Sequence, residues 1–128
     1  MPIPITASTL SALVSAALAQ KPTRPLVLAL DGRCGSGKTT LANRLAAQLP
    51  AQPLVILEGS YSHHPLLRPY ETLRVFVTCT KAEQTRRLQA REGARYADFA
   101  ARWVPLEEGY FAQYGIAESA DFVVETTK

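Results

Sequence analysis

Short apolar runs alternate along the chain with stretches that show helical periodicity. The residues from Leu26 to Leu30 are all apolar, in a run too short for a globular helix and without polar alternation. Such a run is typical of a strand that is buried on both faces of a parallel sheet. Apolar runs at 54–57, 73–79 and 122–124 predict further strands, and we expect the run at 54–57 to be buried too. Strands separated by helices predict an α/β fold, with a parallel sheet and helices on both faces.

The N-terminal region is predicted to hold one helix and a linker. Residues 1–5 form an extended lead-in, because two prolines keep this stretch out of a helix. Thr6 or Ser8 is then expected to cap an amphipathic helix, and 20–25 is a linker to the first strand. The helix is predicted from apolar residues at helical spacing, namely Leu10, Leu13, Val14, Ala17 and Leu18.

Two helices are predicted in the C-terminal half. Thr80 and Glu83 form a capping box that opens a helix, and Gly93 ends it. A further helix is expected to begin at Pro105, because proline suits the first helical position, and to stop at Gly115. Glu107 and Glu108 suit the first turn of this helix.

A glycine-rich motif follows the first strand directly. Residues 32–39 satisfy G-x-x-x-x-G-K-[ST], and Leu41, Leu45 and Leu49 predict a helix immediately after it. Strand, glycine loop and helix in this order are the context in which the motif binds nucleotide phosphates. The predicted phosphate-binding residues are Gly32, Arg33, Cys34, Gly35, Ser36, Gly37, Lys38 and Thr39.

The residue types in this loop have separate tasks. The glycines allow the loop to wrap with its N–H groups pointing inward, where they meet the anion together with the positive end of the helix dipole. Lys38 is expected to neutralise the β- and γ-phosphates, and Thr39 to offer its hydroxyl to Mg²⁺. Arg33, Cys34 and Ser36 would contribute mainly their backbone.

Two acidic residues stand at the ends of predicted strands. Glu58 ends the second strand, where a carboxylate can meet Mg²⁺ or its waters, although a solvent-facing Glu is the alternative. Asp31 ends the first strand. It could reach a metal ion or an acceptor substrate, or it could equally brace the backbone of the loop.

The adjacent His63 and His64 do not predict a metal site. Neighbouring side chains diverge on most backbones, and no third ligand is spaced for them, so they are interpreted as loop residues.

Composition and charge narrow the functional class. The 128 residues are 47% hydrophobic and 20% charged, which predicts a single globular domain over 1–128. We find no signal peptide, no run that could span a bilayer and no disulfide framework, so we expect a cytoplasmic protein without a membrane partner. The net charge is +3. Without an aromatic–basic recognition motif, this mild charge disfavours nucleic acid and fits a nucleotide's phosphates.

Several segments together resemble one known family. They are DGRCGSGKTTLA, LEGSYSHHPLLRPY, LRVFVTC, RRLQARE and RWVPLEEGYF. The chain looks like the bacterial uridine kinase-like proteins, in the uridine kinase and phosphoribulokinase group of P-loop kinases. The resemblance extends from Leu26 to Val124, with the segments in family order. It implies a three-layer P-loop NTPase fold that binds ATP and Mg²⁺.

The resemblance also implies roles for particular residues. Lys38, Thr39 and Thr40 would hold the phosphates and Mg²⁺, and Glu58 would be the acid on the metal side. Residues 86–104 would form a lid-like arginine-rich segment, with lid arginines over the transferring phosphate at Arg87, Arg91 and Arg102.

The chain departs from the family by an internal deletion. Family members carry a further strand and an acidic stretch, with the base for the acceptor hydroxyl, where this chain has only 50–53. We therefore expect four parallel strands in the spatial order 54–57, 26–30, 73–79 and 122–124. The exposed edge that the deletion leaves could pair with a second copy, which leaves a homo-oligomer open.

Two functions remain open at this stage. The first is an ATP-dependent phosphotransferase that acts on a hydroxyl of a nucleoside or similar small molecule, with Lys38, Glu58, Arg87, Arg91 and Asp31 as candidate catalytic residues. The second is a nucleotide-binding module without kinase activity, because the acceptor segment is absent.

Overall fold

Five parallel strands form the centre of the protein. A computed structural model describes residues 2–49 and 54–127, so the turn predicted at 50–53 lies outside the described residues. The strands are β1 (Ile3–Ile5), β2 (Leu26–Gly32), β3 (Leu54–Glu58), β4 (Leu73–Thr78) and β5 (Phe122–Glu125). Their spatial order is β1-β5-β4-β2-β3, and every neighbouring pair is parallel. The α/β class, the parallel sheet and the predicted order of four strands are confirmed.

The fifth strand, β1, was not predicted. It pairs only with β5, so that Pro4 lies opposite Val123 at the edge of the sheet. The N–H of Ile3 donates to the carbonyl of Asp121. Neighbouring residues of a strand point their N–H groups to opposite sides, so the position without an N–H, Pro4, is the one that faces away from β5.

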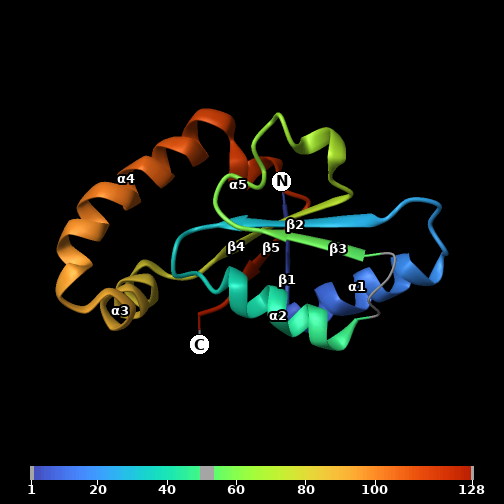
Figure 1. Cartoon of the computed structure of the whole chain (residues 1–128), viewed down its shortest axis with the longest axis horizontal. Coiled ribbons are helices and arrows are strands. Elements are labelled where there is room, and N and C mark those ends of the chain that lie inside the picture. Colours follow the sequence, from blue (N-terminus) through green and yellow to red (C-terminus); the bar gives the residue numbers. More distant parts are fainter. Residues whose placement is uncertain (1, 50–53, 128) are drawn as a thin grey trace.

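Helices cover both faces of the sheet (Figure 1). On one face lie α1 (Ala7–Ala19), capped by Thr6, the first of the two predicted caps, and α2 (Lys38–Gln48). On the other lie the C-terminal half of α4 (Tyr96–Tyr114) and the short α5 (Ile116–Ser119). Between β4 and α4 the chain forms α3 (Lys81–Glu92), whose predicted capping box is confirmed, and η2 (Gly93–Arg95). Another short 3-10 helix, η1 (Arg68–Tyr70), lies in the loop before β4.

The two faces of the central strands bury different sets of side chains. Alternate residues of β2 and β4 pack against α1 and α2 on one face, and Phe76 packs against α4 and α5 on the other. Asp31 is in register with Phe76, so its side chain points to the α4 face rather than to the α2 face.

Strand β3 differs from the prediction of a second buried strand. It lies at the edge of the sheet, and Val55 and Leu57 are exposed while their neighbours are half-buried. An edge strand that is covered on one face alternates in this way. The exposed edge expected from the deletion is therefore formed by β3 among the described residues.

The predicted start of a helix at Pro105 is wrong. Pro105 lies in the middle of α4, which begins at Tyr96 and runs to the predicted stop at Gly115. The missing N–H of Pro105 leaves the carbonyl of Ala101 without its helical partner. Both residues are exposed, so water can supply that hydrogen bond. Figure 1 shows α4 curving away from the sheet beyond the strand ends, so that its N-terminal half stands over the glycine loop region.

No helix in residues 2–49 and 54–127 is both long and apolar enough to cross a membrane.

Candidate functional site

The glycine loop joins the C-terminal end of β2 to the first turn of α2. Gly32 has φ +148°, and a Cβ at this position would lie 2.0 Å from the carbonyl oxygen of Val77 on the neighbouring strand. Gly37 is the N-cap of α2 with φ +98°. A residue with a side chain would clash at the first position and would be strained at the second. The loop therefore keeps its shape only because glycine stands at these two positions.

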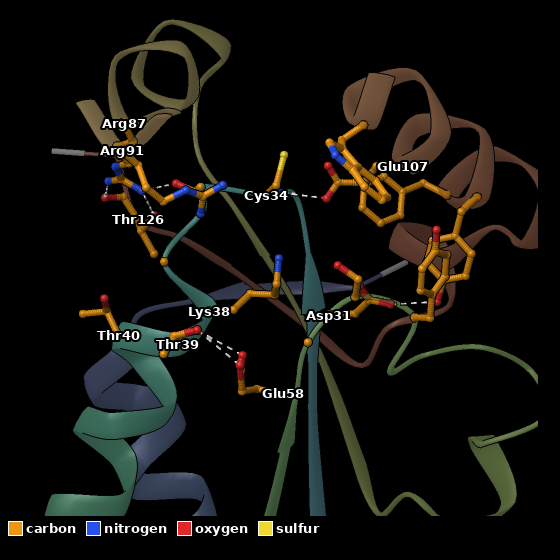
Figure 2. Close-up of a pocket in the computed structure, with 18 of the residues that line it drawn as sticks. Asp31, Cys34, Lys38, Thr39, Thr40, Glu58, Arg87, Arg91, Glu107 and Thr126 are labelled. Carbon is orange, nitrogen blue, oxygen red and sulfur yellow. Dashed lines mark hydrogen bonds between the residues drawn. The ribbon is translucent and has the colours of Figure 1, made fainter. Parts of the chain in front are cut away.

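Lys38 begins α2 and extends along the loop. Its ammonium group donates to the carbonyl oxygens of Gly32 at 2.8 Å and Arg33 at 3.0 Å. Figure 2 shows the group between Cys34 and Asp31, at the centre of a cavity. The positive charge is thus held over the inner side of the loop, next to the N-terminus of α2, where an anion is favoured.

The predicted metal ligands Thr39 and Glu58 lie together. The hydroxyl of Thr39 donates to Oε1 of Glu58 at 3.0 Å, and Oε2 is 3.3 Å away. Thr39 comes from α2 and Glu58 from the end of β3, and the pairing of β2 with β3 brings the two elements together. A hydroxyl and a carboxylate are oxygen ligands that suit Mg²⁺, which keeps several waters or phosphate oxygens in addition.

Asp31 braces the loop, which was one of its two predicted roles. The side chain is fully buried. Oδ1 accepts from the N–H of Gly32 at 2.7 Å, and Oδ2 accepts from the N–H of His63 at 3.1 Å and the hydroxyl of Tyr110 at 2.7 Å. Burial is the main cause that raises the pKa of Tyr110, and its bond to Asp31 adds to it, so the phenol stays protonated as the donor. Three donors on a buried carboxylate fix its orientation.

His63 has a structural task as well. It is fully buried, and its Nε2 lies 2.8 Å from the carbonyl oxygen of Ala29. A carbonyl can only accept, so Nε2 carries the proton. Burial lowers the pKa of His63, which keeps the ring neutral. No cluster of three or more potential metal-binding residues (His, Cys, Asp or Glu) occurs within 2–49 and 54–127.

The two candidate lid arginines have different surroundings. Arg87 pairs with Glu83 at 2.7 Å and donates to the carbonyl of Gly35 at 3.2 Å, and it makes two further bonds to Thr126 at 2.9 Å. It therefore anchors the loop to α3 and to the chain after β5. Arg91, one turn later, pairs with the adjacent Glu92 and lies 5.3 Å from the ring centre of Phe99.

Both arginines line the cavity, whereas two other predicted arginines do not. Arg33 pairs with Glu108 at 3.0 Å and lies against the ring of Phe111. Arg102 lies 5.5 Å from the ring centre of Trp103 on the exposed part of α4. Of the two arginines that line the cavity, Arg91 on α3 thus has fewer hydrogen bonds to the rest of the protein than Arg87.

A cavity of about 780 Å³ connects these groups. This volume lies within the range of about 300–1,000 Å³ that is usual for small-molecule sites. One side consists of the loop, Lys38, Thr39, Thr40 and Glu58. The opposite side is aromatic, and its rings are Tyr61, Phe99, Trp103, Tyr110 and Phe111.

One acidic residue of the site was missed by sequence reasoning. Oε1 of Glu107 accepts from the N–H of Cys34 in the loop at 2.5 Å, although the two residues are far apart in sequence (Figure 2). Its Oε2 is buried without a hydrogen-bond partner among the described residues. Burial raises the pKa of Glu107, while the Cys34 groups and Lys38 oppose this change. Burial and the Glu107 carboxylate together raise the pKa of the Cys34 thiol to about 12.

A signal for Glu107 was present in the sequence. The expected helix start at Pro105 explained Glu107 as a first-turn acid that complements the helix dipole. Yet Glu107 shares one helical face with Tyr110, Phe111 and Tyr114, at spacings of i, i+3, i+4 and i+7. That stripe packs toward the sheet and carries Glu107 with it into the cavity wall.

The chain matches no protein-family model and none of the curated proteins with which it was compared. The likeness to uridine kinase-like proteins thus stays a prediction, and the support for a function comes from the geometry of the site.

Proposed function

We propose that this protein is a P-loop phosphotransferase that transfers the γ-phosphoryl group of ATP to a hydroxyl of a nucleoside or similar small molecule. The observation that carries the proposal is the arrangement of Lys38, Thr39 and Glu58 around one end of the cavity. A strand end, a glycine loop and a helix N-terminus hold these three groups together. Phosphoryl transfer depends mostly on positioning and charge neutralisation, and these groups supply both.

Each residue would act on a different part of the nucleotide. The loop N–H groups and the N-terminus of α2 would hold the phosphates, and Lys38 would turn from the loop carbonyls toward the β- and γ-phosphates. Thr39 and Glu58 fit Mg²⁺, directly or through its waters, and the bound ion would neutralise charge on the transferred group. Arg91 lies at the same cavity and could turn from Glu92 to the phosphate.

The aromatic side of the cavity supports a separate acceptor position. Tyr61 and Trp103 are both about half exposed there, at 48% and 46%. Exposed rings beside a polar site offer flat apolar contact to the body of a small molecule while its hydroxyl faces the phosphates.

A nucleotide-binding module without turnover is the second candidate. The observation that favours it is that Lys38 and the N–H of Cys34, two groups expected to meet phosphate, already have partners within the chain. A module of this kind would bind ATP through the same loop but would not release ADP when an acceptor is added.

The test is ADP release from Mg²⁺-ATP with a panel of nucleosides and small alcohols, together with ATP affinity measured by calorimetry. Lys38→Ala should abolish both acceptor-dependent ADP release and tight binding. Lys81→Ala is the matched control, because Lys81 is an exposed lysine at the start of α3 and does not line the cavity. If ATP binding depends on Lys38 but no acceptor gives turnover, the protein is a nucleotide-binding module and not a kinase. If ATP binding does not depend on Lys38, both proposals are wrong.

A further inference from the structure

Three carboxylates line the cavity in the described part of the chain, and they differ in how their oxygens are used. Asp31 already accepts three hydrogen bonds from the protein. Glu58 pairs with the hydroxyl of Thr39 at the position that suits Mg²⁺. Glu107 accepts a backbone N–H with one oxygen and has a second oxygen without a hydrogen-bond partner.

The second carboxylate oxygen of Glu107, Oε2, is free to accept a hydrogen bond from a bound molecule. A buried acceptor without a partner costs free energy. The nearby Cys34 thiol is only a weak donor. A substrate hydroxyl is a donor of the missing kind. The terminal torsion of a Glu side chain is broad, so the carboxylate can rotate to turn its unpartnered oxygen toward the cavity that Glu107 lines.

The position of Glu107 relative to Lys38 decides which end of the nucleotide it would meet. Lys38 is close enough to lower the pKa of Glu107, and the lysine of this motif reaches the β- and γ-phosphates. Figure 2 shows Lys38 between the Thr39–Glu58 pair and Glu107. With a γ-phosphate at Lys38, Glu107 would lie on the side opposite the Thr39–Glu58 pair, next to the aromatic residues of the cavity.

We propose that Glu107 is the acceptor-side base, which aligns the substrate hydroxyl and takes its proton during transfer. This inference rests on the proposed kinase function. As the acceptor oxygen forms its bond to the γ-phosphorus, the O–H proton passes to the Glu107 carboxylate. The bond from the γ-phosphorus to the β,γ-bridging oxygen breaks, and ADP leaves with that electron pair. Proton transfer to solvent then restores the carboxylate.

The backbone of the loop holds this base in place. The bond from the Cys34 N–H ties one carboxylate oxygen to the loop and keeps the carboxylate at the cavity wall. Burial raises the pKa of Glu107, which makes the carboxylate a better proton acceptor.

The variants for the test are Glu107→Gln, Glu107→Asp and Glu108→Gln. Glutamine keeps the shape and can still accept the Cys34 N–H, but it cannot take a proton. Glu108 is the adjacent acid, with a side chain that is 45% exposed and paired with Arg33 outside the cavity. It controls for loss of one negative charge on α4.

Glu107→Gln should lower kcat about 10²- to 10⁴-fold, the usual contribution of a general base, while the Kd for ATP changes less than about threefold. The wild-type pH profile should show activity falling on the acid side, and that fall should be absent in the variant. Glu107→Asp should keep part of the activity, and Glu108→Gln should behave as wild type.

The other outcomes separate this inference from the function on which it rests. A wild-type protein that phosphorylates no acceptor would overturn both the kinase function and the role of Glu107 as a base. An active wild type with an equally active Glu107→Gln variant overturns the base while leaving the kinase standing. A loss of kcat that comes with a matching loss of ATP affinity, or with an unchanged pH profile, also overturns it, because Glu107 would then act only on the shape of the loop.

Discussion

The hydroxyl of Tyr110 donates a 2.7 Å hydrogen bond to Oδ2 of Asp31, and so joins the middle of α4 to the end of β2 directly before the glycine loop. Both groups are buried. The bond holds the aromatic wall of the cavity, which α4 carries, at a set distance from the loop. The N–H of His63 reaches the same oxygen from a third segment.

Tyr110→Phe should lower the free energy of unfolding by about 1.5–3 kcal/mol, the range for a hydrogen bond to a charged group. The ring remains, so packing against Phe76 and Phe111 is kept. Chemical denaturation measures the change. Tyr114→Phe is the matched control, because the hydrogen bond from Arg68 to Tyr114 is accepted by the backbone carbonyl and is kept in the variant, so it should be close to neutral. Equal effects of the two variants would mean that the bond to Asp31 contributes nothing.

The elements that the sequence predicted well depend on neighbouring residues. The apolar run of β2, the capping box at Thr80 and the stop at Gly115 are local patterns, and each lies where it was expected. The order of four strands was expected from the resemblance to P-loop kinases, in whose sheet a right-handed crossover joins the first two strands. The side chains that the loop motif contributes could be named for the same reason.

The features that were missed depend on contacts between distant segments. Strand β1 forms because residues Ile3–Ile5 pair with β5. Three residues that include a proline show no local sequence pattern that predicts a strand. Pro105 predicts a helix start by itself, but the packing of Tyr110 and Phe111 on the sheet stabilises a helix that extends through it. Glu107 enters the site through the same packing.

Glu58→Gln should raise the Mg²⁺ concentration needed for half-maximal ATP binding, by about tenfold or more. The amide cannot supply the negative charge that Glu58 offers beside Thr39. Thr39→Val should act in the same direction, and Thr39→Ser, which keeps the hydroxyl, should stay near wild type. Calorimetric titration of ATP at a series of Mg²⁺ concentrations gives the result. If none of these variants changes the Mg²⁺ dependence of ATP binding, Thr39 and Glu58 do not bind the metal ion.

Glu107 should make the stability of the protein depend on pH. Its pKa is raised in the folded state, mainly by burial, so the folded protein prefers the protonated acid. Its contribution is then fully present below the unfolded pKa of about 4.3 and is lost as the pH rises through the folded pKa. Above the folded pKa, the ionised Glu107 lowers the free energy of unfolding by about 1.4 kcal/mol for each pKa unit by which folding raises its pKa.

The measurement is thermal unfolding of wild type and Glu107→Gln at about pH 5 and about pH 8. Glutamine cannot ionise, so the variant should gain in melting temperature over wild type at the higher pH and gain much less at the lower. Glu108→Gln serves again as the control and should show a much smaller trend, because the charge of Glu108 is the smallest of the causes that raise the pKa of Glu107. A gain that is the same at both pH values would contradict the raised pKa.

Two glycine substitutions should have opposite effects. Gly109 lies in the exposed middle of α4, where an added Cβ meets nothing within 4 Å, so Gly109→Ala should stabilise the protein by about 1 kcal/mol through helix propensity. Gly32→Ala places a Cβ 2.0 Å from the carbonyl oxygen of Val77, in a backbone conformation that disfavours side chains. The rigid β4 backbone cannot yield, so the loop or the pairing of β2 with β4 must break. Circular dichroism and denaturation should show a stabilised Gly109→Ala and a poorly folded Gly32→Ala. A Gly32→Ala protein with wild-type stability and wild-type ATP affinity would show that the loop does not need the close approach to β4.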